Sequence, residues 1–358
     1  MSVMANTKKK AKRKKGNGIR IGIVLIAVLA FIAAGFFYIV FLSSSTKFAS
    51  DEVTFLISAK NANKQYIKKE LKEQLKTTQY RTFLGLAEWT GYWKNIKPGR
   101  YIIKEGMGVF TLFRKLHNGS QDPVKVTINK IRTREDLAKF LGKKLESTTS
   151  DFSRFMNNND SLAYLGLTKE TVLTLVIPNT YEIYWNTDPK AFFSKMNKEA
   201  NKFWNDRRLD DLQRIGISKE EAITIASIVE EETNDNKEKP TIASVYLNRL
   251  KKGMPLGADP TVKFAVGDFA IKRVTLNHIN SSASSPYNTY KNKGLPPGPI
   301  CTPSVSSIDA VLKGEKTDYL YFCAKADFSG SHSFAATAEE HFNNARKYRK
   351  ALDSLGIR

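Results

Sequence analysis

Three consecutive glutamates, Glu230–Glu232, end a stretch whose residue types could carry acid–base chemistry. Upstream, Ser218 and Glu221 have the spacing of a capping box, which predicts a helix running from there to Thr233. The large apolar side chains of this helix share one face: Ile223, Ile225, Ile228 and Val229. At about 100° per residue, Glu232 lies about 25° from the centre of that face, whereas the other two glutamates lie more than about 120° away. Glu232 is therefore predicted to point inward.

An inward carboxyl has properties suited to general acid catalysis. Burial disfavours the ionised form, and the two neighbouring glutamates and the negative end of the helix act in the same direction, so we expect a raised pKa for Glu232. A carboxylic acid that is protonated near neutrality can donate a proton in a reaction. The plainer alternative is a helix end at which Glu232 is solvated or paired with Arg249. Taken alone, the helical periodicity favours this plainer alternative over a catalytic role for Glu232.

A second helix and a long loop are predicted to complete the site. Pro240 opens the helix and Gly253 follows its end, which brings Asn248 and Arg249 close to Glu232. The stretch 256–303 is rich in Gly, Pro, Ser and Asn, and a stretch of this length within a domain is more often a binding loop than a linker. With Asn248, its polar and aromatic residues form the predicted substrate-binding set: Asp259, Thr261, Tyr287, Asn288, Thr289 and Tyr290. Tyr, Asn and Thr are side chains that hydrogen-bond to sugars and stack on them, although taken singly each of these loop residues would be ordinary surface.

These stretches resemble the MltG (YceG-like) family of membrane-anchored endolytic murein transglycosylases. The matching segments are IPNTYEIYW (177–185), ASIVEEET (226–233), IASVYLNRLKKGMPLGADPTV (242–262), SPYNTYKNKGLPPGPICTPS (285–304) and YLYFCA (319–324). The resemblance covers roughly residues 50–358. Two positions depart from the usual pattern: Glu231, which is often a lysine in relatives and makes the local field more negative, and Cys301, where a small residue is usual.

The resemblance implies both a catalytic residue and a reaction. Glu232 is the second glutamate of the family's E-x-E-T pattern, the same residue that helical phase selects. The implied reaction is cleavage of the β-1,4 bond between N-acetylmuramic acid (MurNAc) and N-acetylglucosamine (GlcNAc) within nascent peptidoglycan glycan strands, giving 1,6-anhydro-MurNAc ends and terminating strand elongation. Asp259, Tyr287, Asn288 and Tyr290 are expected to hold the sugar. The resemblance also implies peptidoglycan synthases as partners, and the chemistry needs no cofactor or metal.

Two alternatives remain open at the level of sequence. One is a muramidase-type hydrolase in which Glu232 is the acid and Asp259 handles water, since such enzymes need two carboxyl groups about 5–9.5 Å apart. The other is a non-catalytic, membrane-anchored scaffold that binds peptidoglycan through its first module. Reducing ends would indicate the hydrolase, and the absence of any cleavage would indicate the scaffold.

The elements that must position these residues are those of an α+β protein. Alternating and helical patterns predict a module of strand, helix, helix and strand, at 51–57, 64–76, 83–89 and 100–104, followed by a helix over 109–116. By the resemblance this module, residues 48–120, is LysM-like and binds sugar. A larger mixed α/β catalytic domain is expected over 122–358. It begins with a strand at 124–128 and a helix capped by Thr133, and further strands are predicted at 180–185 and 319–324.

A charge-free apolar run, 21–42, predicts one transmembrane helix. At 1.5 Å per residue it reaches about 33 Å, enough to cross a hydrocarbon core of about 30 Å. Seven cationic residues within 8–15 predict that the N-terminal tail, residues 1–20, is cytoplasmic. We therefore expect a single-pass protein of the bacterial cell (inner) membrane whose catalytic domain is extracytoplasmic, or periplasmic. The alternative is a cleaved secretory signal, which normally has a shorter apolar stretch of about 7–15 residues.

Charge and composition exclude several other classes of function. The net charge of +22 over 358 residues first suggests nucleic acid, but eight of the excess charges lie in residues 1–20 as a topology signal, so no nucleic-acid partner is predicted. Cys301 and Cys323 are the two cysteines, which rules out a disulfide-rich scaffold and leaves one bridge between them open. The four histidines lack paired metal-binding spacing: His117, His278, His332 and His341.

Overall fold

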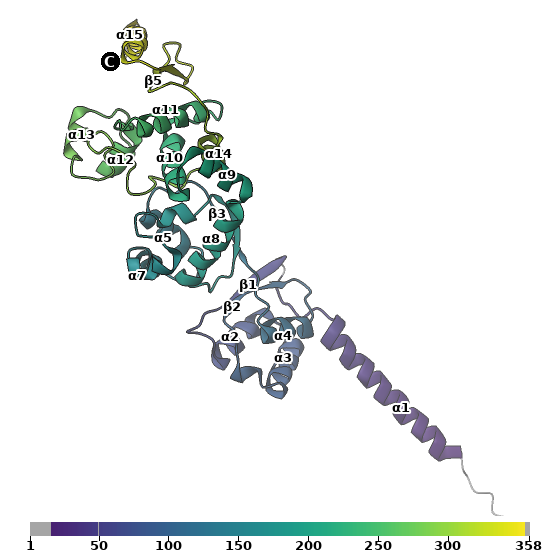
Figure 1. The fold of residues 1–358 in the computed structure, drawn as a ribbon. Coiled ribbons are helices and arrows are strands. Elements are labelled where there is room, and N and C mark those ends of the chain that lie inside the picture. Colours follow the sequence, from purple (N-terminus) through teal and green to yellow (C-terminus); the bar gives the residue numbers. More distant parts are fainter. Residues whose placement is uncertain (1–15, 49, 355–358) are drawn as a thin grey trace, which may run out of the picture. The chain divides into compact units, whose positions relative to one another are not determined.

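A computed structural model of the chain describes residues 16–48 and 50–354. The cationic residues of positions 8–15, and with them most of the predicted cytoplasmic tail, lie outside these ranges. The described residues form two compact units that divide between Asp122 and Pro123. Figure 1 shows the elements of each unit. The fold is mixed α/β, as predicted.

The N-terminal apolar run is helical. Helix α1 spans Gly16–Phe37 and continues into a short π-helical segment, Tyr38–Leu42. The segment Arg20–Val40 is long and apolar enough to cross a membrane. Most of its large side chains are exposed, as Leu29 at 64% and Phe31 at 82% illustrate, whereas Val40 at its end is buried. A helix of a soluble core would bury one apolar face, so this exposure is compatible with a membrane anchor.

The first unit has the predicted order of strand, helix, helix and strand. Its elements are β1 (Glu52–Ile57), α2 (Lys64–Gln74), α3 (Thr77–Trp89), a 3-10 turn (Tyr92–Lys94), β2 (Gly99–Lys104) and α4 (Val109–Asn118). Strands β1 and β2 pair antiparallel, with Phe55 opposite Tyr101. Helix α3 begins six residues earlier than predicted, at Thr77. The helices bury Leu71, Phe83 and Leu116 in a common core.

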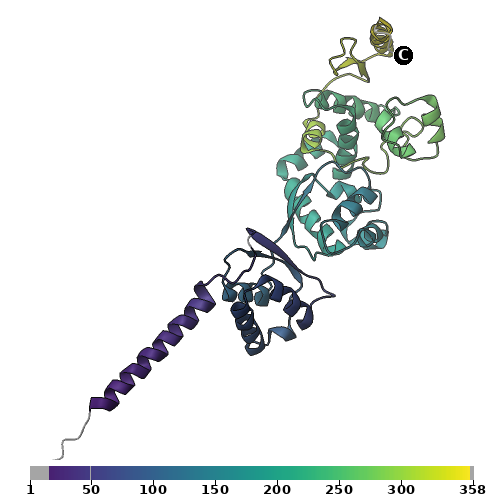
Figure 2. The same cartoon turned by 180° about the vertical axis from the view of Figure 1, so that it is seen from behind.

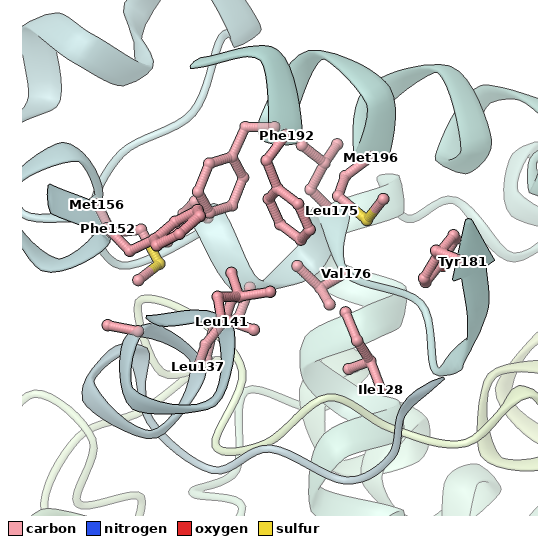
Figure 3. Packing of buried hydrophobic residues seen from close by; sticks show 14 of the residues in the cluster. Ile128, Leu137, Leu141, Phe152, Met156, Leu175, Val176, Tyr181, Phe192 and Met196 are labelled. Carbon is pink, nitrogen blue, oxygen red and sulfur yellow. The ribbon is translucent and has the colours of Figure 1, made fainter. Parts of the chain in front are cut away.

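The second unit begins with a helical layer on a short sheet. Its first elements are β3 (Val124–Ile128), α5 (Arg134–Gly142), α6 (Thr149–Met156), α7 (Asn159–Leu162), two 3-10 turns (Ala163–Leu165 and Val172–Leu175), β4 (Asn179–Ile183) and α8 (Pro189–Phe203). Strands β3 and β4 pair antiparallel. Thr133 caps α5 through a capping box with Asp136, which confirms the predicted cap. Figure 3 shows Leu141, Phe152 and Phe192 converging in the core between these helices.

The rest of the second unit contains one deeply buried helix, α10. The elements are α9 (Asp206–Ile215), α10 (Lys219–Glu232), α11 (Lys239–Lys251), α12 (Asp259–Val266), α13 (Leu276–Ser281), α14 (Val305–Lys313), β5 (Tyr321–Ala324), β6 (His332–Ala335) and α15 (Ala338–Ser354). Helix α10 packs against α11, α12 and α14, and all its residues from Ala222 to Val229 are buried. Both views show α12 and α13 side by side (Figures 1 and 2).

Two sequence expectations need correction here. The stretch 256–303 is not a continuous loop, because it contains α12 and α13. Pro260 lies in the first turn of α12, where its missing N–H costs nothing, and Gly267 ends the helix with φ 79°. The bridge that the sequence left open is not formed either, since Cys301 and Cys323 are both free thiols.

Candidate active site

Glu232 is the last residue of α10, and its carboxyl reaches a pocket of about 190 Å³. The predicted capping box starts this helix: Ser218 accepts from the N–H of Glu221, whose carboxylate accepts from the N–H of Ser218. The pocket is lined by Glu232, Tyr246, Arg249, Leu256, Gly257, Asp259, Tyr290 and Phe322. The predicted catalytic residue, Glu232, thus shares a pocket with two residues of the predicted substrate-binding set, Asp259 and Tyr290.

Tyr246 holds the carboxyl of Glu232 in place. Its hydroxyl donates to Oε1 of Glu232 at 2.6 Å, and its side chain is fully buried. The ring meets Phe322 edge-on, with centroids 6.0 Å apart. The sequence analysis did not identify Tyr246 as a residue of the site. A buried tyrosine hydroxyl normally needs a hydrogen-bond partner, and that rule is the signal that could have found it.

Burial raises the pKa of Glu232 to about 7. The hydrogen bond from Tyr246 and the positive charges of Lys263 and Arg249 act to lower this pKa, while the negative charge of Asp259 raises it further. The predicted direction is confirmed. The neighbouring charge responsible is Asp259, whereas the sequence analysis named Glu230 and Glu231.

Those two glutamates are paired with cations. Burial acts to raise the pKa of Glu230, but hydrogen bonds from Ser304 and Ser307, both at 2.5 Å, and the ammonium of Lys239 at 3.2 Å lower it overall. The carboxylate of Glu231 pairs with Lys130 at 3.0 Å and Arg132 at 3.2 Å. Each charge is thus neutralised locally, which explains why neither glutamate governs Glu232.

Arg249 does not form an ion pair with Glu232, which was one of the two possibilities in the plainer alternative. Its Nε donates to the carbonyl of Leu320 and its Nη1 to the carbonyl of Leu256, each at 2.6 Å. Its guanidinium carbon lies 5.3 Å from the ring centre of Tyr321. No salt bridge joins Arg249 to Glu232 in the part of the chain that the structure describes. Arg249 therefore ties the segment before β5 to the loop after α11 and contributes a positive charge to the pocket.

Asp259 and Tyr290 form a second polar pair in the pocket. The hydroxyl of Tyr290 donates to Oδ1 of Asp259 at 2.6 Å. Burial, this hydrogen bond and the charge of Asp259 all raise the pKa of Tyr290, so its hydroxyl stays protonated. Asp259 begins α12, while Tyr290 comes from the loop after α13. The pair therefore places the carboxylate of Asp259 near Glu232, with one carboxylate oxygen already hydrogen-bonded to Tyr290.

The other residues of the predicted substrate-binding set hydrogen-bond to the backbone and to each other and so hold the neighbouring loops in place. Thr261 and Thr289 are buried and share a hydrogen bond of 2.8 Å, and buried Asn288 donates to the carbonyl of Ile279 and to Ser282. Direct sugar contact, as the sequence predicted for these three, does not fit their burial. The amide of Asn248 donates to the carbonyls at positions 317 and 319, at 2.7 and 3.0 Å.

Tyr287 lies outside the pocket of Glu232. Its ring packs on Phe264, with centroids 4.6 Å apart, and it lines a separate hollow with Arg132 and Arg134. Burial raises the pKa of Tyr287 to about 12. Cys301 is buried and its thiol donates to the carbonyl of Ser227 at 3.5 Å, as a structural thiol would.

Comparison with known proteins places this site in a family. The family model described as "YceG-like family" matches residues 57–347. The chain is 40% identical over 163 residues to an endolytic murein transglycosylase of Bacillus subtilis (strain 168), covering 46% of this chain and 44% of the relative. It is 26% identical over 295 residues to a protein of the same name from Streptococcus pneumoniae (strain D39), covering 73% of this chain and 52% of the relative. The chain thus spans about half the length of these curated relatives.

A solved structure agrees with these matches. The crystal structure of a YceG-like protein from Listeria monocytogenes superposes with a TM-score of 0.52 at 28% identity, covering 82% of this chain and 98% of that one. The family match extends over most of the chain and includes every residue of the pocket around Glu232. The chain belongs to the YceG-like family.

Proposed function

We propose that this protein is an endolytic murein transglycosylase that cleaves the β-1,4 bond between MurNAc and GlcNAc within peptidoglycan strands. The observation that carries the proposal is Glu232: a carboxyl at the end of a buried helix, with its pKa raised to about 7, open to a polar pocket. Such a group can donate a proton and then accept one in the same catalytic cycle. The names of the curated relatives support this reading.

The reaction needs one acid–base group. Protonated Glu232 donates its proton to the glycosidic oxygen, the bond from that oxygen to C1 of MurNAc breaks, and GlcNAc leaves with a hydroxyl group. The resulting Glu232 carboxylate removes the proton of the C6 hydroxyl of MurNAc, and that oxygen bonds to C1. The product end is 1,6-anhydro-MurNAc, Glu232 is again protonated, and no water is consumed.

The neighbours of Glu232 supply orientation and charge. Tyr246 fixes the carboxyl through its hydrogen bond of 2.6 Å. The carboxylate of Asp259, oriented by Tyr290, is suited to stabilise the positive charge that develops on the sugar as the bond breaks. Because Asp259 already accepts from Tyr290, we assign it this electrostatic role rather than the activation of water.

The chemical nature of the product ends tests the proposal. Full-length protein in detergent is incubated with purified glycan strands, and the ends are read by mass spectrometry. We expect anhydro ends from the wild type and from Glu220→Gln, a control at the exposed start of the same helix. Glu232→Gln should be slower by about 10²–10⁴-fold, the usual contribution of a general acid–base group.

The opposite outcomes identify the rivals. Reducing ends would assign the chain to the muramidase-type hydrolases, with Asp259 handling water. No cleavage by the wild type would favour the anchored scaffold. Full activity of Glu232→Gln would show that the catalytic residue lies elsewhere.

We further propose that α1 anchors the protein in the bacterial cell (inner) membrane with its N-terminus in the cytoplasm. The exposed apolar surface of α1 and the cationic residues at positions 8–15 support this orientation. The strand, helix, helix, strand order of the first unit supports a LysM-like, sugar-binding module. Peptidoglycan synthases remain the proposed partners, because terminating nascent strands requires proximity to their synthesis.

A further inference from the structure

A second hollow lies beside the pocket of Glu232. It has a volume of about 160 Å³ and is lined by Arg132, Glu231, Pro260, Lys263, Phe269 and Ile300. Two of these residues directly adjoin residues of the first pocket in the chain: Glu231 precedes Glu232 in α10, and Pro260 follows Asp259 in α12. Both hollows are therefore lined by residues of α10 and α12, and the charge of Lys263 in the second hollow acts on Glu232 in the first.

The second hollow carries an excess of positive charge. Its one carboxylate, Glu231, pairs with both Lys130 and Arg132. The guanidinium of Arg132 also lies over the ring of Phe269, with its carbon 4.8 Å from the centroid. Lys263 has neither an ion pair nor a side-chain hydrogen bond in the ranges that the structure describes. Two cations of the lining, Arg132 and Lys263, thus face one anion, and the ammonium of Lys263 is available to a ligand.

We propose that this hollow binds a carboxylate of the peptide stem attached to the MurNAc residue being cleaved, with Lys263 as its principal contact and Arg132 beside it. The inference rests on the proposed function. In a strand that bears peptides, the lactyl carboxyl at C3 of MurNAc is held in an amide bond, so the anionic groups of the strand are the carboxylates of those peptides. Pro260, Phe269 and Ile300 provide an apolar wall against which small peptide side chains can pack.

The position of Lys263 links binding of the peptide carboxylate to the protonation of Glu232. Its positive charge acts on Glu232 and opposes the rise of that pKa. A carboxylate bound to Lys263 neutralises the opposing charge, which keeps Glu232 protonated to a higher pH. A strand that carries peptides would thereby favour the form of the enzyme that can donate a proton.

Binding of a muramyl peptide tests the carboxylate site without any cleavage. The probes are N-acetylmuramyl-L-alanyl-D-glutamate and its diamide, which have the same shape and differ in charge. With the full-length wild type in detergent, we expect the dicarboxylate to bind at least about 10-fold more tightly, as loss of one charge-assisted contact predicts. Lys263→Gln should abolish the difference. Lys252→Gln, an exposed lysine just after α11, is the matched control and should retain it.

Equal binding of the two probes to the wild type, or an unchanged preference in Lys263→Gln, would overturn the proposal. Thermal melting of each variant shows that the substitution leaves the fold intact.

Cleavage provides an independent readout. At pH 5, where Glu232 is protonated with or without the charge of Lys263, Lys263→Gln should lower kcat/KM for peptide-bearing strands about 10-fold and leave kcat/KM unchanged for strands whose peptide carboxylates are amidated. An equal loss on both substrates would contradict recognition of the carboxylate. If the wild type cleaves neither substrate, the proposed function fails while the binding experiment still decides the carboxylate site.

Discussion

Burial of one carboxyl in the pocket links the proposed chemistry to the stability of the fold. The pKa of Glu232 is about 7 in the folded protein, against an ordinary value of 4.5. Between these pH values the folded state binds more protons than the unfolded state. The stabilising contribution is therefore complete below pH 4.5 and is lost as the pH rises through 7. A protein that keeps an acid protonated in this way loses stability at alkaline pH.

Glu232→Gln should remove this pH dependence. Because 2.5 pH units correspond to about 3 kcal/mol, we expect the variant to be more stable than the wild type by up to about 3 kcal/mol at pH 8 and nearly equal to it at pH 4. Hydrogen exchange of the α10 amides at the two pH values measures the difference locally. Parallel pH profiles for wild type and variant would mean that Glu232 titrates normally.

Tyr246→Phe should change both the rate and the pH profile of cleavage. The Tyr246 hydroxyl lowers the pKa of Glu232, so its removal raises that pKa and moves the alkaline limb of kcat/KM, expected near pH 7 in the wild type, to higher pH. We also expect kcat to fall about 10-fold because the carboxyl loses its orienting bond. Tyr319→Phe is the control, and a similar shift in that variant would count against the specific role of Tyr246.

Helical phase was sufficient to select Glu232 but not its surroundings. The direction of a side chain relative to its own helix follows from 3.6 residues per turn, so the inward position could be predicted from a single segment. The partners Tyr246 and Asp259 lie 14 and 27 positions further along the chain. Which of many polar residues meets Glu232 depends on how α10, α11 and α12 pack, and local periodicity contains no such information.

At the scale of elements, the short helices of 256–303 show why composition misleads. Pro260 and Gly267 are residues typical of loops, yet here they begin and end α12. Eight and six residues are too few for α12 and α13 to show a clear apolar period. Helix α12 persists because Pro260, Thr261 and Val262 are buried, so tertiary packing stabilises a helix that its local sequence does not predict.

The loop after α13 depends on a close approach at Gly298. A Cβ at this position would lie 2.0 Å from the backbone carbonyl oxygen of Glu170, so Gly298→Ala should displace the loop that carries Tyr290 and cost about 3 kcal/mol. Gly294 has a φ of 84° and open space around it, so Gly294→Ala should cost only the backbone strain of a left-handed residue, about 1 kcal/mol. Urea unfolding of both variants, followed in the second unit, checks the ranking. Equal costs would show that the loop adapts.

At the scale of the whole molecule, the order of elements was more predictable than their pairing. Alternation identified the strands at 124–128 and 180–185, and the structure pairs β3 with β4 across about 50 intervening residues. Such pairing reflects a shared core rather than a local signal, so it could not be derived from either strand alone. The net charge likewise combines two parts with different roles, because eight of the 22 excess charges lie in residues 1–20.

The apolar helix α1 is expected to hold the protein in the membrane. Leu29 and Ile32 lie near the middle of Arg20–Val40 and are 64% and 60% exposed. An arginine at the centre of a membrane helix disfavours insertion by about 2.5–3.5 kcal/mol, so Leu29→Arg with Ile32→Arg should largely abolish insertion, whereas alanines at both positions should not. Resistance to alkaline carbonate extraction measures the inserted fraction. The intact mass of the wild type then distinguishes an anchor from a cleaved signal. Loss of the residues before about position 45 would refute the anchor. An uncleaved chain in the membrane fraction would show that the site of Glu232 belongs to a membrane-anchored protein.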